Sequence, residues 1–196
     1  MNSKTIKYII IILLLPVVPL KATAQTGIYY STNGQLSSSL INQLYQDQRG
    51  FIWISTEFGL NKFDGTHFTH YKHIDNDSTS LINNHVRGVF EDSYRNLWIR
   101  CLGGLMLYHP ETDDFELIKI EGKEGRHVTN IMELHNGEVW GITTGDTIFR
   151  INLTQKVIEP IDEINRKLHL KSFSSIYEDT RRNLWFISET QGLLCF

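Results

Sequence analysis

The sequence predicts an all-β protein built from β-propeller blades, with about four repeats of four short antiparallel strands. Three observations support this prediction. All 4 tryptophans lie on one lattice, with spacings of 45, 42 and 45 residues (Trp53, Trp98, Trp140 and Trp185). The residues around them repeat, and turn signals divide each repeat into segments of strand length. A period of ~40–45 residues is typical of a propeller blade.

The residues on both sides of each tryptophan repeat by type. Apolar or aromatic side chains stand twelve, nine, eight and one positions before it in every unit, as Val86, Val89, Phe90 and Leu97 do before Trp98. Six positions before it, three units have an aspartate and the third unit has a leucine (Asp47, Asp92, Leu134 and Asp179). A Gly-Leu pair follows the tryptophan in three units, and an aromatic residue closes each unit. Agreement at this many positions identifies a structural repeat.

Each unit is expected to contain short strands rich in β-branched and aromatic residues. In the first unit these are residues 41–46, 51–56, 60–63 and 66–72, and in the second 86–91, 96–101, 105–108 and 115–120. The blade repeats are placed near 37–73, 82–120, 125–161 and 170–196. The fourth unit reaches Phe196 after its third strand.

Two turns separate the strands of a unit. Asp47 and Gly50 mark the first turn, because aspartate bonds the backbone two residues on and glycine tolerates a positive φ. In units two and four the turn begins at Asp92 or Asp179, and Asn96 or Asn183 is expected to take the left-handed conformation. The second turn is marked by a glycine in three units (Gly59, Gly104 and Gly192).

The tryptophans are interpreted as residues that pack one blade against the next. The first two strands carry apolar residues on both faces, as in Leu44 beside Tyr45 and Ile52 beside Trp53. A strand with one face in water would alternate apolar and polar residues, whereas the strands of a blade are covered on both faces by the neighbouring blades. Stacking of all four tryptophans on sugars is the less favoured alternative, because buried aromatic residues mostly serve packing.

The units resemble the two-component regulator propeller repeat. The resemblance rests on residues 44–56 (LYQDQRGFIWIST) with 59–65 (GLNKFDG), on 89–99 (VFEDSYRNLWI) and on 176–185 (IYEDTRRNLW). It implies the periplasmic sensor region of Bacteroidetes hybrid two-component histidine kinases, many of which sense oligosaccharides. The sequence lacks the kinase and DNA-binding parts of that family. It also departs where the family has glycine two residues after the tryptophan (Ser55, Arg100, Ile142 and Ile187).

The first 24 residues are expected to be a secretory signal peptide. Lys4 and Lys7 precede an apolar stretch at 8–20, and Ala22 and Ala24 form a cleavage site, so the exported chain would begin at residue 25 and be periplasmic. An uncleaved anchor is the alternative. Residues 25–196 hold 16 Lys and Arg against 22 Asp and Glu, a net charge of −6. This excludes a nucleic-acid binder that relies on a basic surface, and no further membrane contact is expected.

Two arrangements of the blades are compatible with the strand count. The segment 27–31 supplies the missing fourth strand of unit four in one arrangement and closes a four-bladed ring. In the other, which we favour, the blades form an open arc or a fragment of a larger propeller. An open arc exposes an apolar blade face at each end, and such faces invite self-association.

The sequence contains no nucleophile motif, phosphate loop or zinc spacing, so no catalytic residue, metal or cofactor is predicted and the chain is not expected to be an enzyme. The ligand-binding candidates lie on turns and strand ends that face one side of a propeller (Glu57, Phe58, Arg100 and Glu189). Arg100 stands where the family has a small residue, and it either pairs with an acid, which we favour, or faces a ligand. Cys101 and Cys195 occupy different repeat positions, which argues against a disulfide between them.

These features favour a ligand-sensing propeller that recognises an oligosaccharide-type ligand. A propeller lyase or glycosidase, an interaction scaffold that uses its exposed blade edges, and an incomplete chain without independent function are the alternatives.

Overall fold

The structure, a computed structural model, describes residues 27–120, 127–144, 147–168 and 172–196. The expected signal segment lies outside the described residues. The described chain is almost entirely β-structure, which confirms the predicted class. Its strands form four successive units: β1 (Ile41–Gln46), β2 (Ile52–Thr56), β3 (Gly59–Phe63) and β4 (Phe68–Tyr71); β5 (Val86–Glu91), β6 (Leu97–Cys101), β7 (Gly104–His109) and β8 (Asp114–Ile120); β9 (Val128–Glu133), β10 (Val139–Thr143), β11 (Thr147–Asn152) and β12 (Val157–Pro160); β13 (Phe173–Glu178), β14 (Leu184–Ser188) and β15 (Gly192–Cys195).

Within each unit, consecutive strands pair antiparallel, as expected for a propeller blade. Units one and four form separate sheets of four and three strands. Units two and three are joined at their outer edges, because β12 runs parallel to β8 and pairs with it at two positions. This contact merges the two blades into one eight-stranded sheet.

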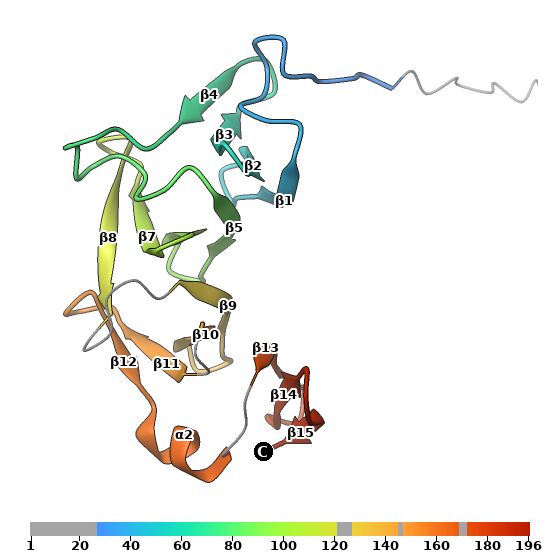
Figure 1. Ribbon diagram of the computed structural model, residues 1–196, viewed down its shortest axis with the longest axis vertical. Helices are drawn as coiled ribbons and strands as arrows, with labels where there is room; N and C mark the ends of the chain where they lie inside the picture. The colour runs from blue at the N-terminus through green and yellow to red at the C-terminus, as the bar shows by residue number, and fades with distance from the viewer. Residues whose placement is uncertain (1–26, 121–126, 145–146, 169–171) are drawn as a thin grey trace, which may run out of the picture.

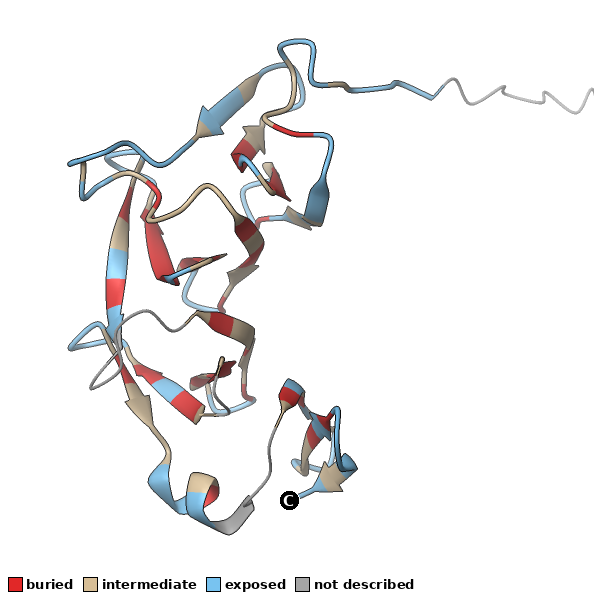
Figure 2. Ribbon diagram, in the orientation of Figure 1, coloured by how far each residue is buried: buried red, intermediate tan, exposed pale blue. Residues whose placement is uncertain are grey.

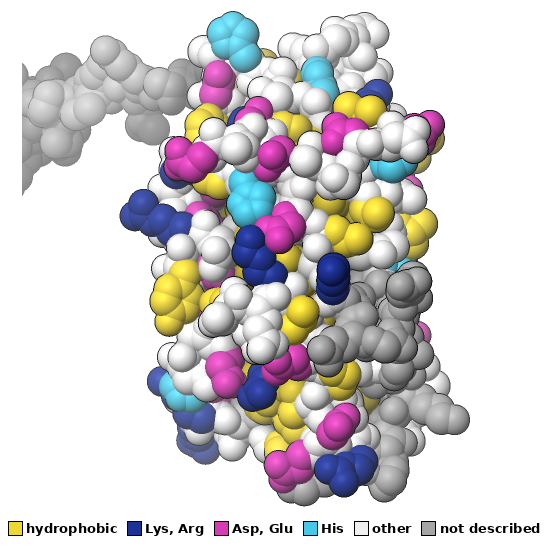
Figure 3. Space-filling view, turned by 90° about the vertical axis from the view of Figure 1, so that its left-hand side faces the viewer, with side chains coloured by type: hydrophobic (Ala, Val, Ile, Leu, Met, Phe, Trp, Pro, Cys, Tyr) yellow, Lys and Arg dark blue, Asp and Glu magenta, His cyan; other side chains and the backbone are white. Residues whose placement is uncertain are grey.

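The four units follow one another along the long axis of the molecule and form an open arc (Figure 1). The first strands β1, β5, β9 and β13 succeed one another on one side, and the fourth strands β4, β8 and β12 lie on the opposite side. The outer side carries acidic and basic side chains interspersed with one another (Figure 3).

The segment 27–31 does not close a ring, so that alternative is wrong for the described structure. These residues form no strand, and the Tyr30 ring packs on Phe63 and Phe68 of unit one, with centroid separations of 5.3 and 5.4 Å. The C-terminal strand β15 lies at the other end of the arc (Figure 1). Aromatic packing of Tyr30 therefore holds the segment 27–31 against unit one, the unit that follows it in the chain.

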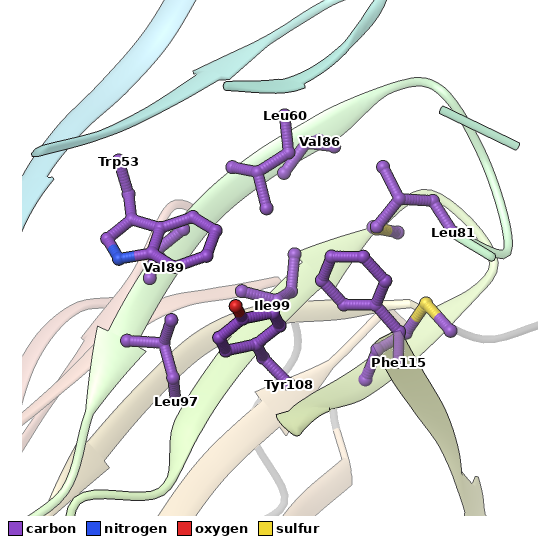
Figure 4. Close-up of a cluster of buried hydrophobic side chains, with 11 residues drawn as sticks. Trp53, Leu60, Leu81, Val86, Val89, Leu97, Ile99, Tyr108 and Phe115 are labelled. Carbon is purple, nitrogen blue, oxygen red and sulfur yellow. The ribbon is translucent and has the colours of Figure 1, made fainter. Parts of the chain in front are cut away.

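The hydrophobic core is divided into three clusters, each lying between two consecutive units (Figure 2). In the first, Trp53 and Leu60 of unit one meet Val89 and Ile99 of unit two (Figure 4). The Trp53 ring is fully buried and meets the Tyr108 ring of unit two edge-on at 4.9 Å. Trp98 lies in the cluster between units two and three, and Trp140 packs against the cluster between units three and four.

The two ends of the arc expose side chains that the internal units bury. Nine positions before the tryptophan, Leu44 is 64% exposed, whereas the equivalent Val89, Ile131 and Ile176 are at most 9% exposed. Eight positions before it, Tyr177 is 61% exposed. The residue nine positions before the tryptophan therefore packs on the preceding unit, and the residue eight positions before it packs on the following unit. We call the two exposed surfaces the end faces, around Leu44 on unit one and around Tyr177 on unit four.

An aspartate clasps the first turn of three units to the tryptophan, and it is buried in units one and two. In unit two, Asp92 Oδ1 accepts hydrogen bonds from the backbone N–H of Tyr94 (3.0 Å) and Asn96 (2.9 Å). Its Oδ2 accepts from Asn96 Nδ2 (2.8 Å) and from Trp98 Nε1 (3.0 Å). One carboxylate thus satisfies the donors of the turn and fixes the indole ring that enters the next core. Asp47 and Asp179 bind Trp53 and Trp185 in the same way.

The left-handed residue of this turn is not the predicted asparagine. Gly50 has φ of 90°, and the equivalent residues of units two and four are Arg95 (φ 67°) and Arg182 (φ 73°). Asn96 and Asn183 are the next residues along the chain, and each donates its side-chain amide to the clasping aspartate. The hydrogen bonds of that carboxylate hold the turn in shape, so a non-glycine residue tolerates the unfavourable φ. The glycines of the second turn, Gly59, Gly104 and Gly192, each begin the third strand of their unit.

Unit three keeps the interaction with a different residue. Leu134 replaces the aspartate, and Trp140 Nε1 donates instead to Glu138 Oε2 at 3.0 Å. Asn136 Oδ1 accepts the backbone N–H of Glu138 at 3.0 Å. A carboxylate two residues before the tryptophan thus replaces one six residues before it, which explains why this unit has the weakest repeat pattern.

A glutamate at the end of each later first strand ties its unit to the previous turn. Glu91 accepts the backbone N–H of Gln48 at 2.7 Å, Glu133 that of Ser93 at 2.8 Å, and Glu178 that of His135 at 2.7 Å. Each glutamate lies seven positions before its tryptophan, where unit one has Gln46. The blades are therefore joined by a repeated charge-assisted hydrogen bond as well as by their cores.

The sequence reasoning did not predict the helix α2 (Asp162–Leu168), which follows unit three. Two acidic residues occupy its first turn, where their negative charges interact favourably with the helix dipole. Ile164 is buried in the third core cluster, and the Asn165 side chain exchanges two hydrogen bonds of 2.9 Å with the backbone of Ile148 on β11. The helix therefore packs against the beginning of β11.

We expect Asp92→Ala to destabilise the protein by about 3 kcal/mol, because it leaves the Trp98 indole and two backbone donors buried without partners. For a chain of this size that loss lowers the Tm by roughly 10 °C. Thermal unfolding followed by tryptophan fluorescence measures it. Asp75→Ala is the matched control, because the Asp75 carboxylate is 93% exposed. Equal melting temperatures for the two variants would show that the clasp is not a main determinant of stability.

Candidate functional site

A polar cavity of about 350 Å³ is shared by the first three units. It is lined by one residue from each of the first strands β1, β5 and β9, together with a residue that precedes β5 and one from β6 (Asn42, Arg87, Thr129, His85 and Arg100). We call it the inner cavity, because the first strands form the inner side of the arc (Figure 1). Its size lies within the range of small-molecule sites.

A β-bulge places the three first-strand residues in the cavity. Pairing with the second strand skips one residue in each unit, between Ile41 and Gln43, between Val86 and Gly88, and between Val128 and Asn130. The skipped residues are Asn42, Arg87 and Thr129, at the same repeat position in three units. An unpaired residue in a bulge can be turned away from the regular strand faces, and bulges are frequent beside binding sites.

Arg100 crosses the floor of the cavity from β6 to the next unit. Its Nη1 donates a hydrogen bond to the Thr129 carbonyl oxygen of β9. Gly88 makes room for it, because a Cβ at residue 88 would lie 2.5 Å from Arg100 Nη2 and 2.0 Å from Gln43 Oε1. Within the described chain, Arg100 forms no ion pair with a carboxylate. The favoured expectation of an acidic partner for Arg100 therefore finds no support there.

The donors of both arginines are incompletely used. The Nε atoms of Arg87 and Arg100 are buried and have no hydrogen-bond partner. Burial, followed by the nearby charge of Arg87, lowers the pKa of Arg100 below its ordinary value. The buried Nε atoms and the lowered pKa of Arg100 both indicate that the two guanidinium groups lie close together and are partly withdrawn from water.

A carboxylate and two histidines complete the surroundings. Glu57 Oε2 lies 2.7 Å from His85 Nδ1, so the acid of unit one pairs with the histidine of unit two. His127 occupies the position in unit three that His85 holds in unit two, thirteen residues before the tryptophan. Burial lowers the pKa of His127, and the positive charges of Arg87 and His85 lower it further. The cavity therefore favours negative charge.

Two of the four predicted ligand-binding residues meet here, and two do not. Arg100 lines the cavity, and Glu57 reaches it through His85. Phe58 is exposed beside Glu57 but does not line the cavity. Glu189 lies on unit four, where its backbone N–H donates to the Ser172 carbonyl (2.9 Å) as that of Glu57 donates to Leu40 (3.1 Å). The other lining residues, Asn42, His85, Arg87 and Thr129, were not predicted. The signal available in the sequence was the repeat position that Asn42, Arg87 and Thr129 share, eleven residues before the tryptophan.

A second polar cluster joins units one and two and is structural. Lys62 Nζ lies 2.8 Å from Asp113 Oδ1 and 5.4 Å from the ring centroids of both Tyr71 and Tyr108. Tyr71 donates its hydroxyl to Asp113 at 2.6 Å, and Tyr108 also donates to it. Burial raises the pKa of Asp113, but the hydrogen bonds from Lys62, Tyr108 and Tyr71 outweigh it and lower that pKa below its ordinary value.

Other features of the described residues give no further site. No group of three metal-ligating side chains gathers among them, and none of their helices is long and apolar enough to cross a membrane. Cys101 and Cys195 are both free, and burial raises the pKa of the Cys101 thiol to about 12. An open apolar depression lies on the end face of unit four, where Tyr177, Trp185 and Leu193 line it.

Comparison with known proteins supports the repeat and the fold. Residues 35–58 match the family model described as two component regulator propeller, which confirms the resemblance for the first unit. A stretch of 46 residues is 46% identical to histidine kinase P4 of Formosa agariphila, and it covers 24% of this chain and 3% of that protein.

Several solved structures have a similar fold. One extracellular domain of a hybrid two component system from B. thetaiotaomicron has a TM-score of 0.66 at 20% identity, over 85% of this chain and 22% of that one. A second has a TM-score of 0.54 at 22% identity, over 86% and 30%. Virginiamycin B lyase from Staphylococcus aureus has a TM-score of 0.55 at 14% identity, over 80% and 55%. Identities this low show the fold alone, and this chain spans only a fraction of each of these proteins.

We expect Asp113→Ala to lower the free energy of unfolding by about 1–2 kcal/mol at pH 7, because three donors lose their shared acceptor, which is itself half exposed. The folded-state pKa of Asp113 is depressed, so its contribution is complete above the ordinary pKa and is lost as the pH falls through the folded value. The difference in Tm between wild type and variant should therefore shrink below about pH 4. Melting curves between pH 3 and pH 7 measure it, and a constant difference would contradict the assignment.

Proposed function

We propose that this chain is the ligand-sensing β-propeller region of a periplasmic two-component sensor and that its inner cavity binds an oligosaccharide-type ligand. The observation that carries the proposal is the cavity itself, because three consecutive blades each place a bulged residue in it. A ligand held there contacts three units at once. Binding therefore favours one relative position of the blades, which is the property a sensor needs.

Several observations support this function over a purely structural one. Residues 35–58 match the two component regulator propeller model, and two solved structures of similar fold are extracellular domains of hybrid two component systems. The cavity lining is rich in amide, hydroxyl and cationic side chains, which suit the hydroxyl groups and ring oxygens of sugars. The signal sequence is consistent with export to the periplasm.

A propeller lyase is the second candidate, and one specific observation favours it. In the pair formed by Glu57 and His85 at the cavity, the imidazole is a proton acceptor held in place by a carboxylate. Virginiamycin B lyase has a similar fold. Product formation from the ligand, abolished in His85→Gln, would favour the enzyme, whereas binding without turnover favours the sensor.

We expect oligosaccharides to raise the Tm of the purified chain, because a ligand that binds only the folded state stabilises it. Screening by differential scanning fluorimetry against defined glycan digests measures this shift. Asn42→Phe should abolish the shift by filling the cavity. Asn33→Phe, on an exposed loop, is the control and should keep it. No shift with any glycan, or an equal shift in Asn42→Phe, would contradict the proposal.

We also propose that the end faces self-associate. Leu44 and Tyr177 occupy positions that pack on a neighbouring unit everywhere else in the array, so a second copy fits head to tail. Leu44→Lys or Tyr177→Lys should therefore lower the apparent mass in light scattering at high concentration. Ile74→Lys is the control, because Ile74 is 57% exposed in a loop. A wild-type chain that stays monomeric at all concentrations would overturn the idea.

A further inference from the structure

We propose that the inner cavity selects an acidic ligand, whose carboxylate or sulfate group is held by Arg87 and Arg100. The inference rests on the proposed function, since it takes the inner cavity to be the ligand site. It goes beyond that function by naming the chemical class of the ligand and the two residues that recognise it.

The first argument is the set of unused donors. The Nε atoms of Arg87 and Arg100 are both buried without a hydrogen-bond partner, although buried polar groups are nearly always paired. Leaving a charged donor unpaired in a desolvated position is costly. Both arginines line the cavity, where the acceptor atoms of a ligand supply the counter-charge that the protein itself does not.

The second argument is the balance of charge. No ion pair joins Arg87 or Arg100 to a carboxylate in the described part of the chain. Glu57, the acid at this site, is already paired with His85 at 2.7 Å. The positive charges of Arg87 and His85 act together with burial to lower the pKa of His127 beside them. The outer side of the molecule has no such excess, because charges of both signs are interspersed there (Figure 3).

The third argument is the way the fold makes room for the cations. The bulge in β5 unpairs Arg87 from the regular ladder, and Gly88 beside it leaves the space that the Arg100 guanidinium occupies. Arg100 is also held in place by its bond to the Thr129 carbonyl of the next unit. A planar guanidinium fixed in this way presents donors in the fork geometry that suits carboxylate and sulfate oxygens.

The flanking residues distinguish a charged sugar from a free anion. Asn42 of unit one and Thr129 of unit three line the cavity on either side of the arginines. The Asn42 side-chain nitrogen donates to the Val86 carbonyl at 2.9 Å, and this bond uses the donor of the amide rather than its acceptor oxygen. The cavity is also far larger than one inorganic anion requires. An acidic sugar fills it, with the charged group on the arginines and hydroxyl groups toward Asn42.

Calorimetric titration of the full chain tests the inference with four probes. These are a galacturonic acid oligosaccharide, a sulfated oligosaccharide, a neutral galactose oligosaccharide of equal length, and sodium sulfate. We expect at least one acidic oligosaccharide to bind roughly tenfold or more tightly than the neutral one, with an affinity that falls as salt is added. Arg87→Met and Arg100→Met should each weaken that binding roughly tenfold or more, while Arg87→Lys restores only part of it.

Arg181→Met is the matched control, because Arg181 is exposed in the turn of unit four, and its affinity should equal that of wild type. A second readout separates recognition from a structural role. If the arginines serve a ligand, Arg100→Met without ligand keeps or raises the Tm, because it removes an unpaired buried cation. A lowered Tm together with unchanged affinity would assign Arg100 to structure and overturn the inference.

The remaining outcomes separate this inference from the proposed function. Equal binding of neutral and acidic oligosaccharides, unaffected by Arg87→Met, keeps the sensor proposal and overturns the acidic specificity. Binding of sodium sulfate as tightly as the acidic sugars would make the cavity a site for free anions and overturn the acidic-sugar assignment. Absence of binding by all four probes would overturn the inference, whereas the proposed function would then fail only if the wider glycan screen also gave no shift.

Discussion

Each tryptophan indole donates a hydrogen bond to a turn carboxylate, and this bond holds every unit of the array in shape. In units one, two and four one aspartate closes the turn and fixes the indole ring. In units one and two that ring enters the core shared with the next unit. Unit three shows that the chemistry matters more than the residue position, because Glu138 supplies the carboxylate where Leu134 has lost it. A buried carboxylate with several donors is expensive to replace, since each lost partner leaves another buried group unpaired.

The units of this array do not have separate cores. Every core cluster combines residues of two consecutive units, and a glutamate of the later unit bonds the turn of the earlier one. Stability in such an array is carried by the interfaces between neighbours. The same construction leaves one unsatisfied face at each end, where Leu44 and Tyr177 are exposed. It also places the inner cavity across the seams between units one, two and three, so that a ligand there acts on the relative position of the blades.

The inner cavity differs from the rest of the described fold in how its charged groups are paired. Elsewhere the buried carboxylates are bound by several donors, whereas Arg87 and Arg100 keep buried donors without partners. The bulges explain how such residues reach the cavity, since each interrupts the strand ladder at one repeat position. Local departures from well-satisfied packing are expected at functional sites, where stability is given up for recognition. The cluster around Lys62 is the contrast, because its charges and hydroxyl groups satisfy one another.

The repeat, the strand positions and the turn that begins with aspartate were predictable from the sequence, because these depend on local periodicity and on side chains a few residues apart. Helix α2 was not predictable in this way, because Ile164 and Asn165 are held by contacts with unit three and its core. The left-handed arginines could not be foreseen either, since their conformation depends on bonds made by the neighbouring aspartate. Arg100 was a candidate from its odd residue type, but its meeting with Arg87, and that of Glu57 with His85, required the tertiary structure. A bulge and the packing of successive blades bring these residues together, and neither is encoded in the spacing of residues along one strand.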